Sequence, residues 1–228
     1  PSYNPATGEV VGHAAFSTVR DVEKAVEAAR AAFPAWRATP APKRGEILFK
    51  AAEILVTRKE ELARLLTMEM GKVLAEARGD IQEAIDMAYY MAAEGRRSFG
   101  QTVPSELANK FMMTVRSPLG VVACVTPWNF PVAIPSWKVF PALVMGNTVV
   151  LKPASDTPIV ASKFVEILVE AGVPAGVLNF ITGPGGALGK TLYYGSRRGG
   201  RLELKKVGWQ EVAWTVVFVV VSAAGFRA

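Results

Sequence analysis

Two short apolar stretches, Val121–Thr126 and Asn147–Lys152, constrain the fold of this chain more than any other feature. Each is rich in β-branched residues, and each ends in a polar residue that a proline follows. A helix-length segment at 131–145 separates them, and a helical pattern at 157–172 leads to a third strand-like stretch at 176–183. Nearly continuous apolar strands are typical of parallel sheets covered on both faces. The pattern therefore predicts an α/β fold with a Rossmann-like, doubly wound parallel sheet.

Amphipathic helices are expected to precede this sheet. The first is capped by Ser17 or Thr18 and is expected to be broken at Pro34 and at the prolines around residue 41. A long helix is expected from about Lys43 to Met70, and another from about Lys72 to Gly95. Beyond them, residues 100–106 have the composition of a loop, and residues 110–116 alternate as a strand does.

Composition excludes several classes of function. The 228 residues contain one cysteine, Cys124, and one histidine, His13, so neither an intrachain disulfide nor a clustered His/Cys metal site is expected. A reducing compartment, the cytoplasm, is favoured, and no signal peptide is visible. Residues 190–228 carry seven Lys and Arg against two acidic residues, which is +5 of the net charge of +6. Because the main body is nearly neutral, nucleic-acid binding is not expected.

The last part of the chain, residues 193–228, differs abruptly in charge and pattern from what precedes it. Its apolar stretch, Val212–Phe226, has 15 residues and is shorter than the ~20 that span a bilayer, so no membrane association is expected. It also contains the β-prone run TVVFVVV. Three interpretations remain: a genuine strand, a damaged reading frame or a poorly determined sequence, and the last two together are favoured over the first.

Three features at the expected strand ends could carry chemistry. Asn129 lies between two prolines, which suits an amide held to donate to an oxyanion, although a turn asparagine would look the same. Lys152 could donate to ribose hydroxyls or phosphate, or could be an ordinary surface lysine. Gly183, Gly185 and Gly189 follow a strand and open a helix, but their spacing is one residue longer than the usual dinucleotide fingerprint, so a tight turn explains them equally well.

In combination, these segments resemble the NAD(P)-dependent aldehyde dehydrogenases over about residues 1–192. The segments that carry the resemblance are NPATGEV, TPWNFP, Trp137-Lys138, GNTVVLKPASDTP and EAGVPAGVLNFITGPG. In that family a cysteine thiolate attacks an aldehyde, the thiohemiacetal passes hydride to the nicotinamide, and water activated by a glutamate releases the acid.

The resemblance implies roles for the matching positions. Asn129 would donate its amide to the oxyanion, and Lys138 would assist proton movement or structure nearby. Lys152 would hold the adenosine ribose of NADP or NAD. Other positions would line the cofactor channel, allow the cofactor to approach the helix, or form the walls of the substrate tunnel: Val125, Thr126, Pro127 and Trp128; Gly185 and Gly189; Phe130 and Trp137.

Ser155 bears on the choice of cofactor. It stands three residues after Lys152, where NAD-preferring relatives carry a glutamate that repels a 2′-phosphate. With serine that repulsion is absent, so NADP is expected to be accepted or preferred. Trp137 stands where some semialdehyde-specific relatives carry an arginine, which favours an apolar or broad range of aldehydes.

The resemblance also implies parts that this sequence does not contain. Cys124 lies within the first strand and is interpreted as a small buried apolar residue, so the nucleophile is not expected in this chain. The expected division is a helical part of the cofactor-binding domain at 1–98, a protruding oligomerisation hairpin at 99–118 and the Rossmann-like half at 119–192, with no catalytic domain.

Two functions therefore stay open. The first is an aldehyde dehydrogenase, a homodimer or homotetramer, of which this chain is a part. The second is a truncated, non-catalytic module that binds nucleotide or caps an intact subunit. An unrelated Rossmann reductase is disfavoured, because the Pro-Trp-Asn-Phe-Pro and Lys-Pro-Ala-Ser segments would have no role in it.

Overall fold

A four-stranded sheet with the order β7–β6–β5–β8 forms the centre of the computed structural model, which describes residues 1–183 and 219–221. Strands β5 (Val121–Val125), β6 (Thr148–Lys152) and β7 (Leu178–Phe180) run parallel. Strand β8 (Val219–Val221) pairs with the other edge of β5 and is antiparallel to it. The parallel part confirms the predicted α/β fold.

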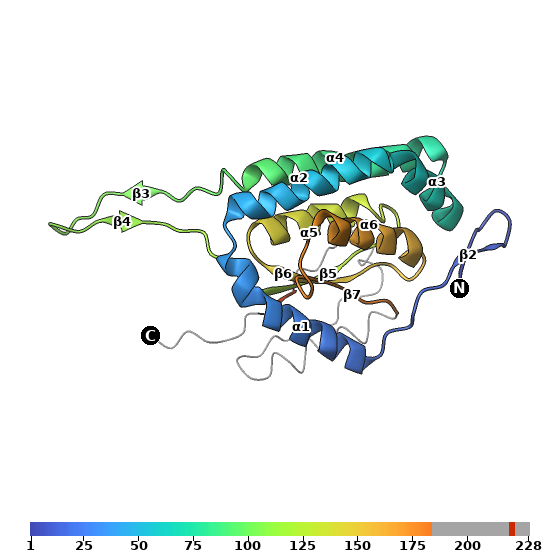
Figure 1. Cartoon of the computed structure of the whole chain (residues 1–228), viewed down its shortest axis with the longest axis horizontal. Helices are drawn as coiled ribbons and strands as arrows, with labels where there is room; N and C mark the ends of the chain where they lie inside the picture. Colours follow the sequence, from blue (N-terminus) through green and yellow to red (C-terminus); the bar gives the residue numbers. More distant parts are fainter. Residues whose placement is uncertain (184–218, 222–228) are drawn as a thin grey trace.

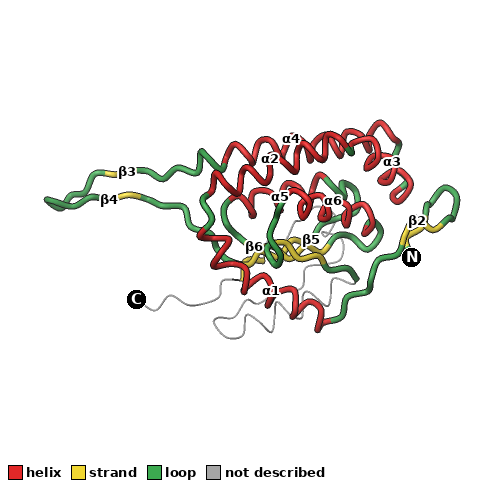
Figure 2. Tube along the Cα trace, viewed as in Figure 1, coloured by secondary structure: helices red, strands yellow, loops and turns green. Residues whose placement is uncertain are grey.

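Helices cover both faces of this sheet (Figures 1 and 2). Helices α5 (Ala133–Val144) and α6 (Pro158–Ala171) connect the parallel strands and lie on one face, and α1 (Val19–Ala38) lies on the other. A further layer packs on α5 and α6 and consists of α2 (Ala41–Thr57), α3 (Lys59–Met70) and α4 (Leu74–Glu94).

The two-sided covering explains why the strands are apolar at almost every position. Val149 and Leu151 of β6 belong to the large core beneath α5 and α6, whereas Val150 between them packs with Val22 and Ala29 of α1. Successive side chains of a strand point to opposite faces, so both faces need apolar residues.

Helix α1 is not broken at Pro34, as the sequence predicted, but continues to Ala38 and ends just before the prolines around residue 41. Proline inside a helix removes one hydrogen bond and costs about 3 kcal/mol. Tertiary contacts hold the following turn in place: the buried Trp36 donates its indole N–H to the carbonyl of Leu143 at 3.1 Å. Arg44 donates to the carbonyl of Trp36 as well, at 3.3 Å.

The single long helix expected between Lys43 and Met70 is two helices, α2 and α3, that meet at Arg58. Arg58 leaves the helical region, with φ −98° and ψ 10°, and its guanidinium pairs with Glu170 of α6 at 2.7 Å. The apolar spacing does not reveal this break, because Leu55 and Leu62 are both buried and lie seven residues, or two helical turns, apart.

Two short hairpins complete the described fold. Strands β1 (Ser2–Tyr3) and β2 (Val10–Gly12) pair near the N-terminus. Strands β3 (Thr102–Val103) and β4 (Met112–Met113) form the long arm that projects from the body in Figure 1, and β3 falls in a segment expected to be a loop. In the described part of the chain, no helix is both long and apolar enough to cross a membrane.

Candidate functional site

The carboxyl ends of β5 and β6 meet at one edge of the sheet and bring the predicted site residues together. Val125 lies opposite Lys152 in the parallel register. The backbone N–H of Thr126 then donates to the carbonyl of Lys152 at 3.1 Å, so the two strands stay joined as they enter their loops. Pro127 and the half-exposed Trp128 continue this edge toward solvent.

Asn129 occupies the loop that leads from β5 to α5. Its side-chain Oδ1 is buried and has no hydrogen-bond partner among the described residues, and the same is true of Thr126 Oγ1. A buried polar atom without a partner costs about 1–3 kcal/mol. Two such atoms, three residues apart in the same loop, mark a place where a polar ligand would restore hydrogen bonds.

An ion pair that sequence reasoning missed lies behind this loop. Lys72, between α3 and α4, reaches Asp80 of α4, with 3.2 Å between Nζ and Oδ2. The same ammonium donates to the backbone carbonyl of Asn129 at 2.7 Å. The other Asp80 oxygen accepts the backbone N–H of Ala133 at 2.8 Å. Burial raises the pKa of the Asp80 carboxyl, while the N–H of Ala133 and the Lys72 ammonium act to lower it.

The sequence does contain one signal for this pair. Asp80 stands in the buried stripe of α4 beside Ala77, Ile81 and Ala84, and it is fully buried. A carboxylate on the apolar face of an amphipathic helix is rarely left without a partner. Its partner Ala133 could not be read from the pattern, because it lies 53 residues downstream in the chain.

Phe130 and Trp137 form an aromatic wall next to Asn129. Their rings stack, with centroids 6.4 Å apart and planes at 28°. The Lys72 ammonium lies over the Phe130 ring, 4.1 Å from its centroid. Lys72 thus contacts the Phe130 ring as well as the Asn129 carbonyl.

Lys152 is buried, which excludes the alternative that it is an ordinary surface lysine. Its ammonium donates to the carbonyl of Pro153 at 2.7 Å. Burial lowers the pKa of Lys152, and the negative charge of Asp156 acts to raise it. An ammonium has three donors, so a buried lysine with this single carbonyl acceptor among the described residues fits hydroxyl or phosphate oxygens of a ligand.

Ser155 lies in the exposed loop after β6, and its hydroxyl donates to the carbonyl of Gly183 at 3.4 Å. This contact places the loop after β6 next to Gly183, which follows β7 and begins the glycine-rich segment. Gly185 and Gly189, to which the family resemblance assigned a cofactor role, lie outside the described residues.

Lys138 and Cys124 lie close to the site but differ in character. Lys138 is a partly exposed residue of α5 whose charge is near enough to influence the Cys124 thiol. Burial raises the pKa of Cys124 to about 12, and Lys138 only partly opposes this effect. Cys124 is thus a buried apolar residue, as expected, and a poor nucleophile.

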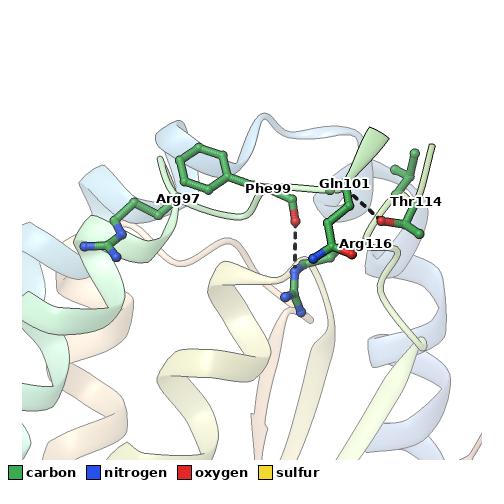
Figure 3. A pocket seen from close by; sticks show the side chains of 7 residues that line it. Arg97, Phe99, Gln101, Thr114 and Arg116 are labelled. Carbon is green, nitrogen blue, oxygen red and sulfur yellow. Dashed lines mark hydrogen bonds between the residues drawn. The ribbon is translucent and has the colours of Figure 1, made fainter. Parts of the chain in front are cut away.

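A hollow of about 460 Å³ lies at the base of the β3–β4 arm. Phe99 accepts a hydrogen bond from Arg116 Nε at 3.1 Å, and the N–H of Gln101 donates to Thr114 Oγ1 at 2.8 Å (Figure 3). Arg116 precedes β5, so this hollow belongs to the amino end of the strand and is separate from the edge that carries Asn129.

Comparison with known proteins agrees with this geometry. The sequence model of the "Aldehyde dehydrogenase family" matches residues 1–197. The chain is 49% identical over 190 residues to the alpha-ketoglutaric semialdehyde dehydrogenase of Bacillus subtilis, and 44% identical over 189 residues to the NADP(+) succinate-semialdehyde dehydrogenase of Escherichia coli. Each match covers 83% of this chain and 39% of the relative.

The solved structures give the same picture. The crystal structure of an E. coli NADP dependent enzyme superposes with a TM-score of 0.81 at 43% identity, over 84% of this chain and 40% of the other. Succinate-semialdehyde dehydrogenase from Burkholderia pseudomallei superposes with a TM-score of 0.81 at 40% identity, with the same coverage. The chain spans about 40% of the length of these relatives. This chain belongs to the aldehyde dehydrogenase family.

Proposed function

We propose that this chain forms the cofactor-binding part of an enzyme that oxidises an aldehyde to a carboxylic acid with NAD(P). The observation that supports the proposal most directly is the edge where β5 and β6 end. There the amide of Asn129, whose Oδ1 is buried, follows β5, and the buried Lys152 ends β6; the hydrogen bond from Thr126 to Lys152 joins the two strands. Ligands of open α/β sheets bind at this kind of edge.

The dinucleotide would supply the hydride acceptor, and the chain's own residues would bind and orient it. Lys152 would donate to the ribose hydroxyls. Its buried ammonium has three N–H donors, and Pro153 supplies one acceptor among the described residues. The channel would be lined by Val125, Thr126, Pro127 and Trp128. Gly185 and Gly189 would allow close approach of the cofactor to the following helix.

Asn129 would hold the aldehyde oxygen as it gains negative charge. An amide aimed at such an oxyanion contributes about 3–4 kcal/mol in comparable sites. Lys138 would assist proton movement or structure nearby. Phe130 and Trp137 would form one wall of the aldehyde tunnel, and their stacked rings supply an apolar surface for it.

The nucleophile would come from a part of the enzyme that this sequence does not include. Cys124 is its only cysteine. Its burial and raised pKa make it unsuitable for attack on an aldehyde. The same observation is compatible with the second candidate function. In that case the chain is a truncated module that binds nucleotide or caps an intact subunit without oxidising aldehydes.

We propose that NADP is accepted at least as well as NAD, because Ser155 offers a hydroxyl and no carboxylate toward the ribose. A carboxylate there would repel a 2′-phosphate. For the aldehyde, the names of the relatives point to semialdehydes, whereas Trp137 favours an apolar or broad range. A panel should therefore include succinic semialdehyde and an unsubstituted aliphatic aldehyde.

We also propose that the β3–β4 arm, residues 99–118, joins subunits of a homodimer or homotetramer. Its side chains Phe111, Met113 and Val115 are more than half exposed. Exposed apolar side chains gathered on one projecting element are typical of an association surface. Residues 1–98 and 119–192 would then together form the cofactor-binding body.

The deciding experiment combines intact mass with cofactor titration. A mass near 24.5 kDa predicts binding of NADPH, measured by quenching of tryptophan fluorescence, without oxidation of any aldehyde. A mass about twice as large predicts aldehyde-dependent reduction of NADP⁺. Tight NAD binding without NADP binding would contradict the role of Ser155. Absence of binding to either nucleotide would contradict the proposed function.

A further inference from the structure

The loop that carries Asn129 is fixed from behind by charged side chains of another layer. Asn129 Oδ1 has no hydrogen-bond partner in the described part of the chain, so the amide group is not fixed by that oxygen. The backbone carbonyl of the same residue, however, accepts the Lys72 ammonium at 2.7 Å. The orientation of the Asn129 side chain therefore depends on a peptide that Lys72 holds.

Asp80 holds the other end of the same loop. One of its oxygens binds Lys72 and the other binds the N–H of Ala133, the first residue of α5. The carbonyl of Asn129 and the N–H of Ala133 are four residues apart, and a single ion pair secures both. Lys72 also lies over the ring of Phe130, so one ammonium contacts two consecutive residues of the proposed aldehyde pocket.

Stability alone does not account for such a pair. Taking two charges out of water costs several kcal/mol for each ion, and replacing a buried pair by uncharged residues of similar shape is often neutral or stabilising. The contacts of this pair converge on Asn129, Phe130 and Ala133, in the segment that leads from β5 into α5. An oxyanion donor must be held in place before the charge develops, because reorganisation during the reaction would reduce its effect.

We propose that the Lys72–Asp80 ion pair is a positioning device that fixes the Asn129 amide and the Phe130 ring for recognition of the aldehyde oxygen. The role of Asn129 rests on the proposed function, whereas the fixing of its side chain does not. Lys72 and Asp80 act through Asn129 and are positioning residues. In this way the helical layer of α3 and α4 sets the geometry at the end of β5.

The double variant Lys72→Met/Asp80→Asn tests this proposal. Methionine fills the volume of the lysine stem, and asparagine keeps an oxygen that can accept the Ala133 N–H. The variant thus removes the hydrogen bond to the Asn129 carbonyl and both charges together, without leaving one charge buried alone. Lys59→Met is the matched control, because Lys59 also joins α3 to α4, through Gln82 Oε1 at 2.6 Å, away from the site.

The measurement is the side-chain NH₂ signal of Asn129 in the 228-residue chain labelled with ¹⁵N-asparagine. The chain has five asparagines. Asn147 and Asn179 donate to backbone carbonyls and serve as ordered references, and Asn109 is the exposed one. We expect the Asn129 signal to lose its distinct position in the double variant and to move toward that of Asn109, while Lys59→Met leaves it unchanged.

Unfolding by urea, measured in parallel, separates positioning from a purely structural role. An unchanged Asn129 signal in the folded double variant would overturn the proposal, whether or not the midpoint falls. If the double variant does not fold, Lys72→Met alone decides: it removes the hydrogen bond to the Asn129 carbonyl while Asp80 keeps its contact with the Ala133 N–H, and the Asn129 signal must still shift.

The same samples distinguish this inference from the proposed function. Failure of the wild-type chain to bind NADPH would contradict the cofactor role but not the positioning. An Asn129 signal that does not respond to Lys72 or Asp80 would contradict the positioning but not the cofactor role. NADPH binding is expected to be similar in wild type, Lys59→Met and the double variant, because Lys72 and Asp80 contact none of Thr126, Lys152 or Ser155.

Discussion

The reactivity of Cys124 is strongly altered by its surroundings. Burial raises its pKa to about 12 from 9.0, which favours the neutral thiol. The thiolate fraction near pH 8 is therefore about a thousandfold lower than for an exposed cysteine. We expect no alkylation by iodoacetamide at pH 8 in the native chain and complete alkylation in urea, followed by mass spectrometry. Fast stoichiometric labelling without denaturant would contradict the buried position.

Arg44 is a buried cation that is satisfied by backbone carbonyls. Its guanidinium donates to the carbonyl of Val144 at 2.9 Å and also to those of Trp36 and Thr39, which joins the carboxyl ends of α5 and α1. Burial lowers its pKa. Lysine cannot reproduce the planar fork, so Arg44→Lys should lower the free energy of unfolding by about 2–3 kcal/mol in urea titrations.

The control for Arg44 is Arg64→Lys. Arg64 is exposed and pairs with Glu60 one turn away on α3, so the substitution should change the free energy of unfolding by less than about 0.5 kcal/mol. Equal effects at the two positions would show that the carbonyl contacts of Arg44 contribute little.

At the residue scale, sequence reasoning selected side chains that stand near recognisable neighbours in the chain. It missed side chains whose partners are far away along the chain. Asn129 lies in a short segment between two prolines. Lys152 ends an apolar strand and precedes a proline, so both residues stand near features that are visible in the sequence. Lys72 gives no such signal, because its contacts with the loop at residues 129–130 depend on how α4 packs against α5.

At the scale of elements, the approach of α2 to α4 depends on Gly45. A Cβ atom at this position would lie 2.5 Å from the backbone carbonyl oxygen of Ala92, which real structures do not tolerate. Gly45→Ala therefore has to push the helices apart, and we expect a loss of about 1–3 kcal/mol in the free energy of unfolding. This loss should outweigh the higher helix propensity of alanine.

Gly79→Ala on α4 is the matched control for this prediction. A Cβ there meets no atom within 4 Å, so the same substitution should stabilise the chain by roughly 0.5–1 kcal/mol. The two variants should thus move the urea midpoint in opposite directions. A stabilising effect of Gly45→Ala would contradict the close packing of α2 on α4.

The order and type of the main elements could be predicted because apolar periodicity reflects burial directly. Strands β5 and β6 and helices α4, α5 and α6 fall within or close to the expected segments. The predictions that failed were boundaries decided by tertiary contacts: Trp36 and Arg44 carry α1 past Pro34, and Arg58 turns the chain between α2 and α3. The 3.6-residue spacing of apolar positions reveals neither the continuation of α1 past Pro34 nor the break at Arg58.

At the scale of the whole molecule, the projecting β3–β4 arm governs association in our proposal. Val115 is 71% exposed and Met113 is 61% exposed. We expect Met113→Lys/Val115→Lys to reduce the mass measured by analytical ultracentrifugation to that of a smaller species, without altering NADPH binding. Lysines on an edge strand oppose pairing with another chain.

Val169→Lys provides the comparison, since Val169 is an exposed apolar residue of α6 far from the arm in sequence. It should leave the oligomeric mass unchanged. If the arm variant keeps the wild-type mass, the proposed role of residues 99–118 in oligomerisation is wrong.

The hydrogen bonds of Trp36 and Arg44 affect how the chain folds while it is being synthesised. Their acceptors on α5 lie 107 and 100 residues further along the chain. At ordinary translation speeds, this interval takes roughly 5 to 20 seconds. During this time the apolar faces of nascent α1 and α2 stay exposed to solvent. We expect these helices to bind ribosome-associated chaperones until α5 has been synthesised.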